Sequence, residues 1–388
     1  MKIVQINCVY GDGSTGVLVR QLHQYLQSRG WESLVLYGRG ADTAEVGVLR
    51  TGPEWYGKGN ALVSRFTGLP YGGCLLATEK LLRILEGERP DVVHLHCVNG
   101  NFVNVYRIAN WLKKKKIRTV VTLHAEFLFT GACAHSLDCE GWKTGCGACP
   151  RFPYDTARAY RNMAEAFRGF GDGVTVVSPS PWLRRRAELA PILREGRHRT
   201  IFNGVDTGIF WDTPCGKSGD GKIIFHATAL FRDDPEHLKG GWYVLELARR
   251  MRGQPVRFLV AGKHKIRGEI PENVTLLGEI RDAGKLAQLY CAADVTLLTS
   301  RRETFSMVCA ESLCCGTPVV GFEAGGPESI APPVYSRFVP WGNLDALQAA
   351  VEEELTTTRD RADISRKSGA AYSLEKMLRA YEQVYLGG

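Results

Sequence analysis

Short apolar runs rich in β-branched residues alternate with helix-length amphipathic segments along the chain, and this alternation restricts the fold more than any other feature. It is typical of parallel sheets that are covered by crossover helices. The runs expected to form strands are 2–8, 32–37, 91–96, 117–123 and 174–177 in the first half, and 222–228, 256–261, 273–277, 294–299 and 317–321 in the second. Helices are expected over segments such as 240–252, 283–292 and 306–315. The sequence therefore predicts an α/β protein.

A chain of 388 residues is longer than one hydrophobic core usually supports, so two domains are expected. Asn203-Gly204-Val205-Asp206 ends an apolar run, and polar, Gly-rich sequence follows it, which places a hinge near 203–221. The domains are expected at 1–204 and 205–372. A helix over 373–388 is then expected to pack back on the first domain.

The composition is that of a globular protein, with 44% hydrophobic and 23% charged residues. The first eight residues lack the continuous apolar stretch of a signal peptide, and no apolar run is long enough to cross a membrane, which predicts a cytoplasmic protein. The net charge is +8, with basic runs at Lys113–Lys116 and Arg184–Arg186. Such runs either form a solvated surface or attract phosphates, nucleic acid or anionic lipid.

A glycine-rich turn follows the first expected strand. Gly11-Asp12-Gly13-Ser14-Thr15-Gly16 opens a segment of helical periodicity. Glycines at such a turn let backbone N–H groups approach a phosphate at the positive end of a helix. The spacing differs from the dinucleotide motif G-x-G-x-x-G, so the residues alone leave open whether this is a phosphate site or only a turn.

Two segments carry histidine at the carboxyl end of an expected strand, the edge of a parallel sheet where ligands bind. His94 and His96 fall on one face of the strand over 91–96, and His124 directly follows the strand over 117–123. Each of these histidines is either a site residue or a hydrogen-bonded structural residue.

Four cysteines lie close together in a glycine-rich loop over 131–151. Cys133, Cys139, Cys146 and Cys149 have the spacing C-x5-C-x6-C-x2-C. Cytoplasmic cysteines stay reduced, and four thiolates that close one small loop suit a structural, tetrahedral zinc ion. Unligated thiols, an iron–sulfur cluster, or a site in which His135 replaces one cysteine are the alternatives.

Two cations flank a polar loop in the second half of the chain. Arg232 and Lys239 lie between an expected strand and the helix that opens at Gly240-Gly241. Two cations and a helix N-terminus would together hold a diphosphate. The alternative is ordinary surface charge.

Two carboxylates eight residues apart flank the start of the expected helix over 306–315. Glu303 precedes the helix and Glu311 lies about two turns within it, so the two fall on the same side. Phe305 and Ser306 stand at the helix N-terminus, where N–H groups suit a diphosphate. Sugar hydroxyls could then meet Glu303 while ribose hydroxyls meet Glu311. Two acids at this spacing also occur by chance.

Taken together, these segments resemble the large fourth family of retaining GT-B glycosyltransferases over essentially the full chain. The matching marks are Gly13-Ser14-Thr15-Gly16, Asn203-Gly204-Val205-Asp206, the Glu303 to Glu311 pair with Gly316-Thr317-Pro318-Val319-Val320, and the terminal helix. Thr122-Leu123-His124, with Phe129-Thr130-Gly131 and the cysteine loop, is similar to the colanic-acid and capsular-polysaccharide branch. The resemblance implies a GT-B fold, in which two facing Rossmann-like domains are followed by a C-terminal helix that returns to the first.

The resemblance also implies roles for the candidate residues. His124 would lie beside the transferred sugar, and Gly13 to Gly16 would approach its phosphates. Arg232 and Lys239 would neutralise the leaving diphosphate. Glu303 would hold sugar hydroxyls and Glu311 the ribose, with Phe305 and Ser306 between them. Catalysis would need no metal ion.

Three positions depart from the family pattern. Ala125 follows the site histidine where the family usually has an acid, and Glu126 comes next. Val17 follows the glycine turn where an arginine is often found. The interval from Arg232 to Lys239 is two residues longer than the usual loop.

The expected activity is transfer of a sugar, with retention of anomeric configuration, from a nucleotide-diphosphate sugar to a saccharide or polyprenyl-linked acceptor. A UDP-sugar is the preferred donor and a GDP-sugar the second choice. The stretch from Trp55 to Leu85, together with Lys113–Lys116, suggests a peripheral site at an anionic membrane surface. A sugar-nucleotide epimerase or phosphorylase, and a zinc-containing nucleic-acid-binding protein, are the alternatives. Nucleic acid is not expected as a partner, because the basic runs lack interleaved aromatic residues.

Overall fold

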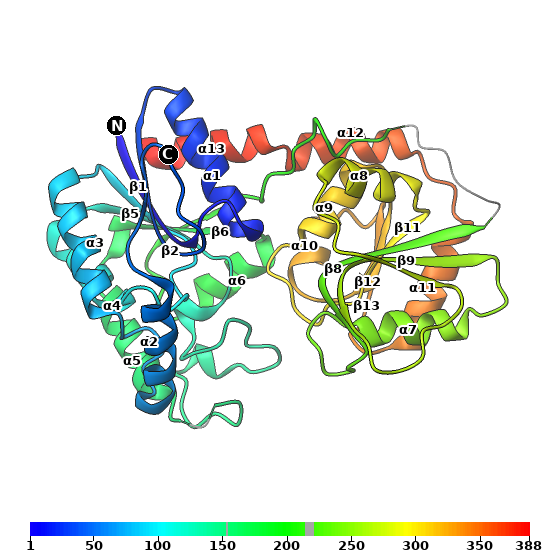
Figure 1. Ribbon diagram of the computed structural model, residues 1–388, viewed down its shortest axis with the longest axis horizontal. Coiled ribbons are helices and arrows are strands. Elements are labelled where there is room, and N and C mark those ends of the chain that lie inside the picture. The colour runs from blue at the N-terminus through cyan, green and yellow to red at the C-terminus, as the bar shows by residue number, and fades with distance from the viewer. Residues whose placement is uncertain (153, 214–220) are drawn as a thin grey trace. The chain divides into compact units, whose positions relative to one another are not determined.

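The computed structural model describes residues 1–152, 154–213 and 221–388. The chain divides into two compact units, one formed by Met1–Ile201 with Leu378–Gly388 and the other by Phe202–Met377 (Figure 1). Part of the expected hinge, 214–220, lies outside the described residues. The domain boundaries expected after 204 and 372 stay a prediction.

The first unit is built on a parallel sheet of seven strands in the order β3-β2-β1-β4-β5-β6-β7. The strands are β1 (Lys2–Val9), β2 (Glu32–Arg39), β3 (Val48–Arg50), β4 (Val92–Leu95), β5 (Arg118–Thr122), β6 (Val174–Ser178) and β7 (Arg197–Thr200). The order reverses between β1 and β4, which creates a crevice at the carboxyl ends of these strands where ligands bind in open α/β sheets.

Helices cover both faces of this sheet. Four helices contribute to the large apolar core on one face, namely α3 (Leu75–Glu88), α4 (Val105–Lys115), α5 (Ala157–Phe167) and α6 (Pro181–Leu189). The opposite face is covered by α1 (Gly13–Ser28) and by the end of α13 (Leu374–Leu386), and α2 (Glu54–Thr67) follows β3. The unit also contains three short 3-10 segments, Phe127–Phe129, Gly141–Lys143 and Gly171–Gly173.

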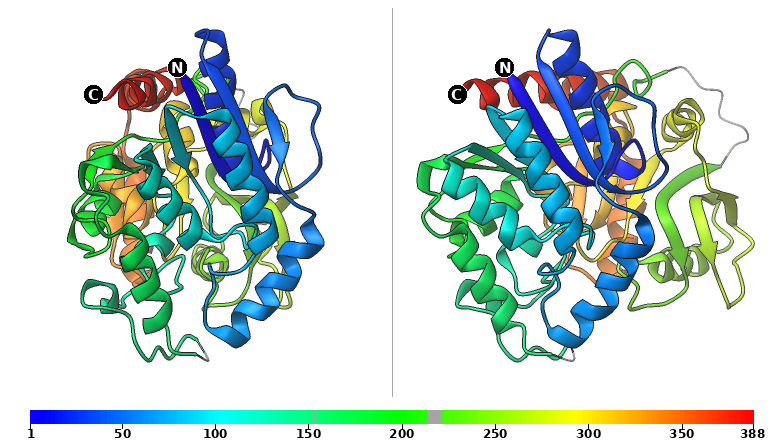
Figure 2. Two further views of the ribbon diagram at one scale, coloured as in Figure 1. Left: turned by 90° about the vertical axis from the view of Figure 1, so that its left-hand side faces the viewer. Right: turned by 60° about the vertical axis from the view of Figure 1, so that its left-hand side comes forward.

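Helix α13 lies beside α1 in the first unit, as Figures 1 and 2 show. Glu382 on α13 accepts hydrogen bonds from the Tyr25 hydroxyl (2.6 Å) and from Arg29 Nε (3.0 Å), both on α1. Tyr381 and Tyr385 are buried against the sheet. Residues more than 350 positions apart thus complete one layer of the unit.

The second unit repeats the arrangement with a parallel sheet of six strands in the order β10-β9-β8-β11-β12-β13. The strands are β8 (Lys222–Arg232), β9 (Val256–Lys265), β10 (Val274–Gly278), β11 (Val295–Leu298), β12 (Val319–Phe322) and β13 (Ser336–Val339). The helices are α7 (Gly241–Arg250), α8 (Ala283–Ala292), α9 (Met307–Cys314), α10 (Gly326–Ile330), α11 (Leu344–Thr356) and α12 (Arg361–Tyr372). The core on one face includes α7 and α11, and the core on the other includes α8, α9 and α12.

The predicted fold class is confirmed, because both sheets are parallel and have the same order of crossover connections. Each of the ten runs expected to be strands overlaps a strand of the structure. The sequence missed β3, β7 and β13, which are edge strands. These three strands are short and partly solvated, so they lack the continuous apolar run of a central strand, as Arg197-His198-Arg199-Thr200 illustrates.

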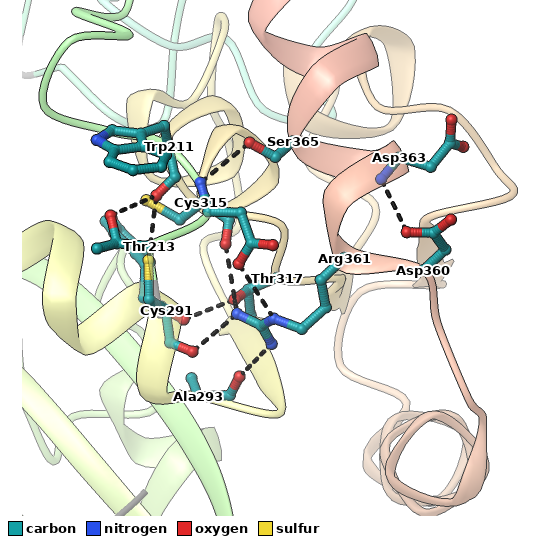
Figure 3. A network of polar contacts seen from close by, with 12 residues as sticks. Trp211, Thr213, Cys291, Ala293, Cys315, Thr317, Asp360, Arg361, Asp363 and Ser365 are labelled. Atoms are coloured by element: carbon teal, nitrogen blue, oxygen red, sulfur yellow. Dashed lines mark hydrogen bonds and ion pairs between the residues drawn. The ribbon is translucent and has the colours of Figure 1, made fainter. Parts of the chain in front are cut away.

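Arg361, the first residue of α12, ties two helices of the second unit together (Figure 3). Its guanidinium donates to the carbonyl of Cys291 at the end of α8 (2.8 Å) and to the Cys315 carbonyl after α9 (3.3 Å). It also donates to the Ala293 carbonyl and to Thr317 Oγ1, at 2.8 and 2.6 Å. Helix ends leave carbonyls unpaired, so one planar cation satisfies groups from both helices.

We therefore expect Arg361→Met to lower the free energy of unfolding by about 2–4 kcal/mol, because it leaves partly buried carbonyls without their donor. Arg366→Ala is the matched control, since Arg366 lies on the same helix and its side chain is 71% exposed in an i,i+3 ion pair with Asp363. This control should change stability by less than about 0.5 kcal/mol. Urea denaturation measures the free energy of unfolding of both variants. Equal losses of stability would contradict the role of Arg361 in joining the two helix ends.

Candidate functional site

The turn between β1 and α1 has a backbone conformation that depends on its glycines. The Gly11 N–H donates to the Gly16 carbonyl (3.0 Å), and the Gly13 N–H donates to Asp12 Oδ1 (3.0 Å). Gly11 and Gly13 have φ angles of 70° and 63°, which L side chains rarely adopt. A Cβ on Gly16 would lie only 3.1 Å from Gly11 N. The turn itself therefore requires these glycines, and phosphate binding by the turn stays a prediction.

His94 is held rigidly inside the first unit. Its Nδ1 lies 2.6 Å from the Tyr385 hydroxyl on α13, and its Nε2 lies 2.7 Å from Thr122 Oγ1 on β5. The Thr122 hydroxyl also lies 2.9 Å from the Tyr381 hydroxyl. Burial lowers the pKa of His94 well below its usual value, so the ring is neutral.

His96 links the candidate residue His124 to the interior of the sheet. His96 Nδ1 lies 3.3 Å from His124 Nε2, and His96 Nε2 lies 3.2 Å from Gln5 Oε1 on β1. His96 and Gln5 are fully buried, whereas His124 is partly exposed. Burial lowers the pKa of His124 to about 4 and that of His96 well below its usual value. All three histidines are therefore neutral near pH 7.

Glu126, which stands near the position of the family's usual acid, points into the cysteine loop instead. The side chain is fully buried. Its Oε1 accepts from Arg186 Nε (2.6 Å) and its Oε2 accepts from the Ser136 N–H (2.5 Å). Arg186 stacks 4.4 Å from the Trp142 ring centroid. Glu126 and Arg186 thus fasten the loop to α6, and Arg186 does not belong to a solvated basic run.

The four loop cysteines line one small cavity of about 100 Å3. Cys146 Sγ accepts from the Gly131 N–H (3.2 Å), and Cys139 Sγ accepts from the Gly141 N–H (3.4 Å). Among the described residues, no group of three or more His, Cys, Asp or Glu side chains is arranged to hold a metal ion. The structure therefore does not support the predicted zinc site of Cys133, Cys139, Cys146 and Cys149.

The cysteine loop buries apolar side chains of its own. Trp142 is 1% exposed and packs edge-to-face on Phe129, with ring centroids 5.5 Å apart. The Tyr160 hydroxyl on α5 donates to the Trp142 carbonyl (3.1 Å). Together with the buried Glu126, these contacts give the loop a core of its own, which the glycine-rich sequence concealed.

In the second unit, Lys239 and Glu303 are brought into direct contact. Lys239 Nζ lies 2.6 Å from Glu303 Oε1, and the two side chains are 33% and 21% exposed. Lys239 precedes Gly240, the N-cap of α7, where a Cβ would lie 2.0 Å from the Thr299 carbonyl oxygen. Arg232 is the last residue of β8, at the other end of the same loop. The cation and the carboxylate expected to bind a sugar phosphate are thus paired with each other.

The start of α9 has an unusual backbone. Ser306 has a φ of 87°, which is rare for a residue with a side chain, and its Oγ accepts from the Cys309 N–H (3.2 Å) as the helix cap. Phe305 is 2% exposed and packs against Phe202, with ring centroids 5.9 Å apart. The Phe305 side chain therefore belongs to the core, and only its backbone could contact a ligand.

Glu311 lies within α9 and has one direct partner that the sequence did not suggest. Glu311 Oε2 accepts from the hydroxyl of Tyr290 on α8 (3.1 Å). Burial raises the pKa of Glu311 to about 7, and the tyrosine hydrogen bond opposes that rise. The carboxylate is therefore poised between its two protonation states near neutral pH.

Sequence reasoning missed Tyr290 and Gln5. Tyr290 occupies a buried helix position, where an aromatic residue is ordinarily part of the core, so no sequence pattern indicates its contact with Glu311. Gln5 and Asn7 are fully buried polar residues within β1. Their interruption of an apolar strand was a signal that an inward-facing polar network exists at this sheet.

Two family models match the chain. The model described as "Glycosyltransferase Family 4" matches residues 15–208, half of the chain, and the model described as "Glycosyl transferases group 1" matches residues 223–357. The chain is also 25% identical to an Escherichia coli (strain K12) protein named as colanic acid biosynthesis glycosyl transferase WcaC, over 99% of both chains.

Solved structures show the same fold. Sucrose-phosphate synthase from Thermosynechococcus elongatus matches with a TM-score of 0.71 and 17% identity, covering 100% of this chain and 99% of that one. Anabaena Alr3699/HepE, in complex with UDP-glucose, matches with a TM-score of 0.66 and 16% identity over 100% of both chains. These likenesses establish a GT-B fold.

The raised pKa of Glu311 predicts a pH-dependent stability. The usual pKa of 4.5 rises to about 7 on folding, so the folded chain holds a proton that the unfolded chain has lost, and stability falls as pH rises from about 4.5 to 7. Between pH 5 and 8, the free energy of unfolding of the wild type should fall by roughly 2 kcal/mol more than that of Glu311→Gln. If curves of the free energy of unfolding against pH run parallel for wild type and variant, the raised pKa of Glu311 is contradicted.

Proposed function

This chain belongs to glycosyltransferase family 4, and we propose that it moves a sugar from a nucleotide-diphosphate sugar to a saccharide or polyprenyl-linked saccharide. The name of the Escherichia coli relative supports a role in the synthesis of a surface polysaccharide. The UDP-glucose in the Anabaena complex supports a UDP-sugar donor, with a GDP-sugar as second choice.

The contact between Lys239 and Glu303 is the observation that carries this proposal. A lysine and a carboxylate in direct contact can each take a different part of a sugar diphosphate, because the ammonium binds phosphate oxygens and the carboxylate accepts from sugar hydroxyls. The pair lies on the loops that open α7 and α9, and helix N-termini favour anions. Ser306 and the backbone of Phe305 would add N–H groups, and Arg232 a second cation.

The proposed reaction retains the anomeric configuration by attack on the same face from which the diphosphate departs. Lys239 and Arg232 would stabilise the charge that develops on the leaving diphosphate. The Gly13 to Gly16 turn would approach the phosphates, and Glu311 would accept from ribose hydroxyls. His124 would lie beside the transferred sugar, where a neutral imidazole avoids repelling the positive charge of an oxocarbenium-like state. Metal catalysis is not part of the proposal.

Donor binding tests this assignment. We expect Lys239→Ala and Glu311→Ala each to weaken UDP binding about tenfold or more, because each removes a charge-assisted hydrogen bond. Lys367→Ala is the matched control, since it removes another lysine–carboxylate pair, with Asp363, from the same unit. Titration calorimetry with UDP and GDP measures the affinities. Unchanged UDP binding in both site variants would overturn the proposal.

An exposed apolar surface in the first unit supports a lipid-linked acceptor. Trp55, Leu62 and Phe66 are 72%, 57% and 83% exposed and follow one another at helical spacing along α2. Leu75 and Leu76 at the start of α3 are 52% and 77% exposed. An amphipathic helix that presents Trp, Phe and Leu to solvent suits the interface of a bilayer. Every helix in residues 1–152, 154–213 and 221–388 is too short or too polar to span a bilayer.

A cavity of about 650 Å3 opens beside this surface, next to β2 and β3. Tyr37, Trp55 and Tyr56 form aromatic walls. Lys80 supplies positive charge, whereas the charge of Arg50 is balanced by Asp42, which lies 2.7 Å away on the same lining. Its volume suits a ligand of several rings, and its mixture of aromatic and charged groups suits a phosphate-bearing saccharide. We propose that it receives part of the acceptor.

The lysine run contributes less to membrane binding than the sequence suggested. Lys113 Nζ donates to the carbonyls of Glu165, Ala166 and Arg168 near the end of α5, at 2.9–3.3 Å. Lys115 pairs with Glu86 at 2.5 Å. Two of the four charges are thus engaged within the unit, and the apolar face of α2 becomes the stronger argument for a membrane surface.

Flotation with anionic phosphatidylglycerol vesicles tests the membrane proposal. We expect wild type to float and the double change Trp55→Ser with Phe66→Ser to reduce the bound fraction about tenfold, through lost apolar burial. Leu189→Ser is the matched control, because Leu189 is 62% exposed on another helix of the same unit. Absence of wild-type flotation would favour a soluble acceptor.

A further inference from the structure

Three imidazole rings stand in contact at the carboxyl ends of β4 and β5. The ring centroids of His94 and His96 are 3.7 Å apart, and those of His96 and His124 are 5.6 Å apart with nearly parallel planes. His94 and His96 are fully buried. Burial and the neighbouring rings hold the pKa of His94 and of His96 well below the usual value. The array is therefore uncharged at neutral pH.

A neutral imidazole has one nitrogen that donates and one that accepts, so contacts in a row fix each other. With the Gln5 amide oriented as in this structure, Oε1 lies 3.2 Å from His96 Nε2 and can only accept, so this orientation puts the proton on His96 Nε2. His96 Nδ1 is then an acceptor. It lies 3.3 Å from His124 Nε2, which must be the donor. Gln5 on β1 thus determines, through His96, which nitrogen of His124 carries the proton.

The position of the ring is fixed by the same elements. His94 has polar contacts at both nitrogens, with Tyr385 on α13 and Thr122 on β5, so it cannot turn without losing a buried hydrogen bond. His96 stacks on His94 and cannot turn independently either. His124 consequently meets a partner whose orientation is set by β1, β4 and α13.

We propose that His96 and Gln5 are positioning residues that hold His124 in the tautomer protonated on Nε2, so that only Nδ1 can accept a hydrogen bond. This inference rests on the proposed function, in which a sugar hydroxyl approaches His124. A sugar hydroxyl that bonds to this imidazole would then donate to His124 Nδ1. The arrangement also keeps a positive charge away from a reaction centre that becomes positive itself.

The tautomer can be measured without any substrate. Long-range proton–nitrogen correlation spectra of the full chain, labelled with nitrogen-15 in histidine and assigned with His124→Ala, should show His124 neutral at pH 7 and protonated on Nε2. The opposite tautomer, which a reversed Gln5 amide would produce, or a charged ring would overturn the inference.

Gln5→Glu tests the transmission of this effect. A buried carboxylate favours the doubly protonated form of His96, whose Nδ1–H would then face His124 Nε2 and drive the His124 proton to Nδ1. We expect a reversed His124 tautomer, turnover reduced at least about tenfold, and UDP affinity changed less than about twofold. An unchanged tautomer in a folded variant would contradict the proposal.

A second pair of variants covers the case in which Gln5→Glu does not fold. His96→Gln keeps an amide oxygen that can accept from His124 Nε2, whereas His96→Leu does not, so turnover should be at least about tenfold higher in the first. The control is His23→Leu, which removes another buried histidine of the same unit, bonded to Ser33 and Val46, and should leave turnover unchanged. Equal turnover of the two His96 variants would refute the role of His96.

Failure of the inference and failure of the proposed function give different results. A wild-type chain that neither binds UDP nor transfers sugar would refute the function, while the tautomer measurement would still stand. A chain that binds UDP and transfers sugar with His124 protonated on Nδ1 would refute only the inference.

Discussion

The first unit depends on a set of buried hydrogen bonds between its sheet and α13. A parallel sheet must be covered on both faces, and alternation along β4 and β5 puts His94 and Thr122 on the face that α13 covers. His94 Nε2 and Thr122 Oγ1 contact each other, but a wholly apolar helix would remove the partner of His94 Nδ1 and the second contact of the Thr122 hydroxyl, at a cost of about 1–3 kcal/mol each. Tyr381 and Tyr385 bring hydroxyls to an otherwise apolar contact. The tyrosine hydroxyls of α13 and the polar groups of the sheet therefore satisfy each other's hydrogen bonds.

The same contacts that stabilise each unit also set the geometry of its candidate residues. In the first unit, the chain of side chains from Tyr385 to His94 and from Gln5 to His96 ends at His124. In the second, Arg361 holds the ends of α8 and α9, the two helices that carry Tyr290 and Glu311. For His124 and Glu311, the contacts that pack each unit therefore also orient the candidate side chain.

Much of the fold could be predicted because central parallel strands are buried on both faces and leave long apolar runs. Edge strands such as β7 leave no such run. The Glu303 to Glu311 spacing was visible because both carboxylates belong to one short segment, yet the pairing of Glu303 with Lys239 depends on how two loops meet. Tyr290 was invisible because a contact between two helices has no local pattern. The zinc prediction failed to find support because it relied on spacing and overlooked the apolar contacts of Trp142.

Completion of the first unit by residues 378–388 has a consequence for synthesis. Chains emerge from the ribosome from the N-terminus at about 5–20 residues per second, and domains generally fold as units. The seven strands of the first sheet are translated well before α13, so the part of its polar face at β4 and β5, which α13 covers, stays uncovered while the whole second unit is made. The first unit therefore reaches its final state only after the second has emerged, and its histidine array is among the last parts of the molecule to acquire its structure.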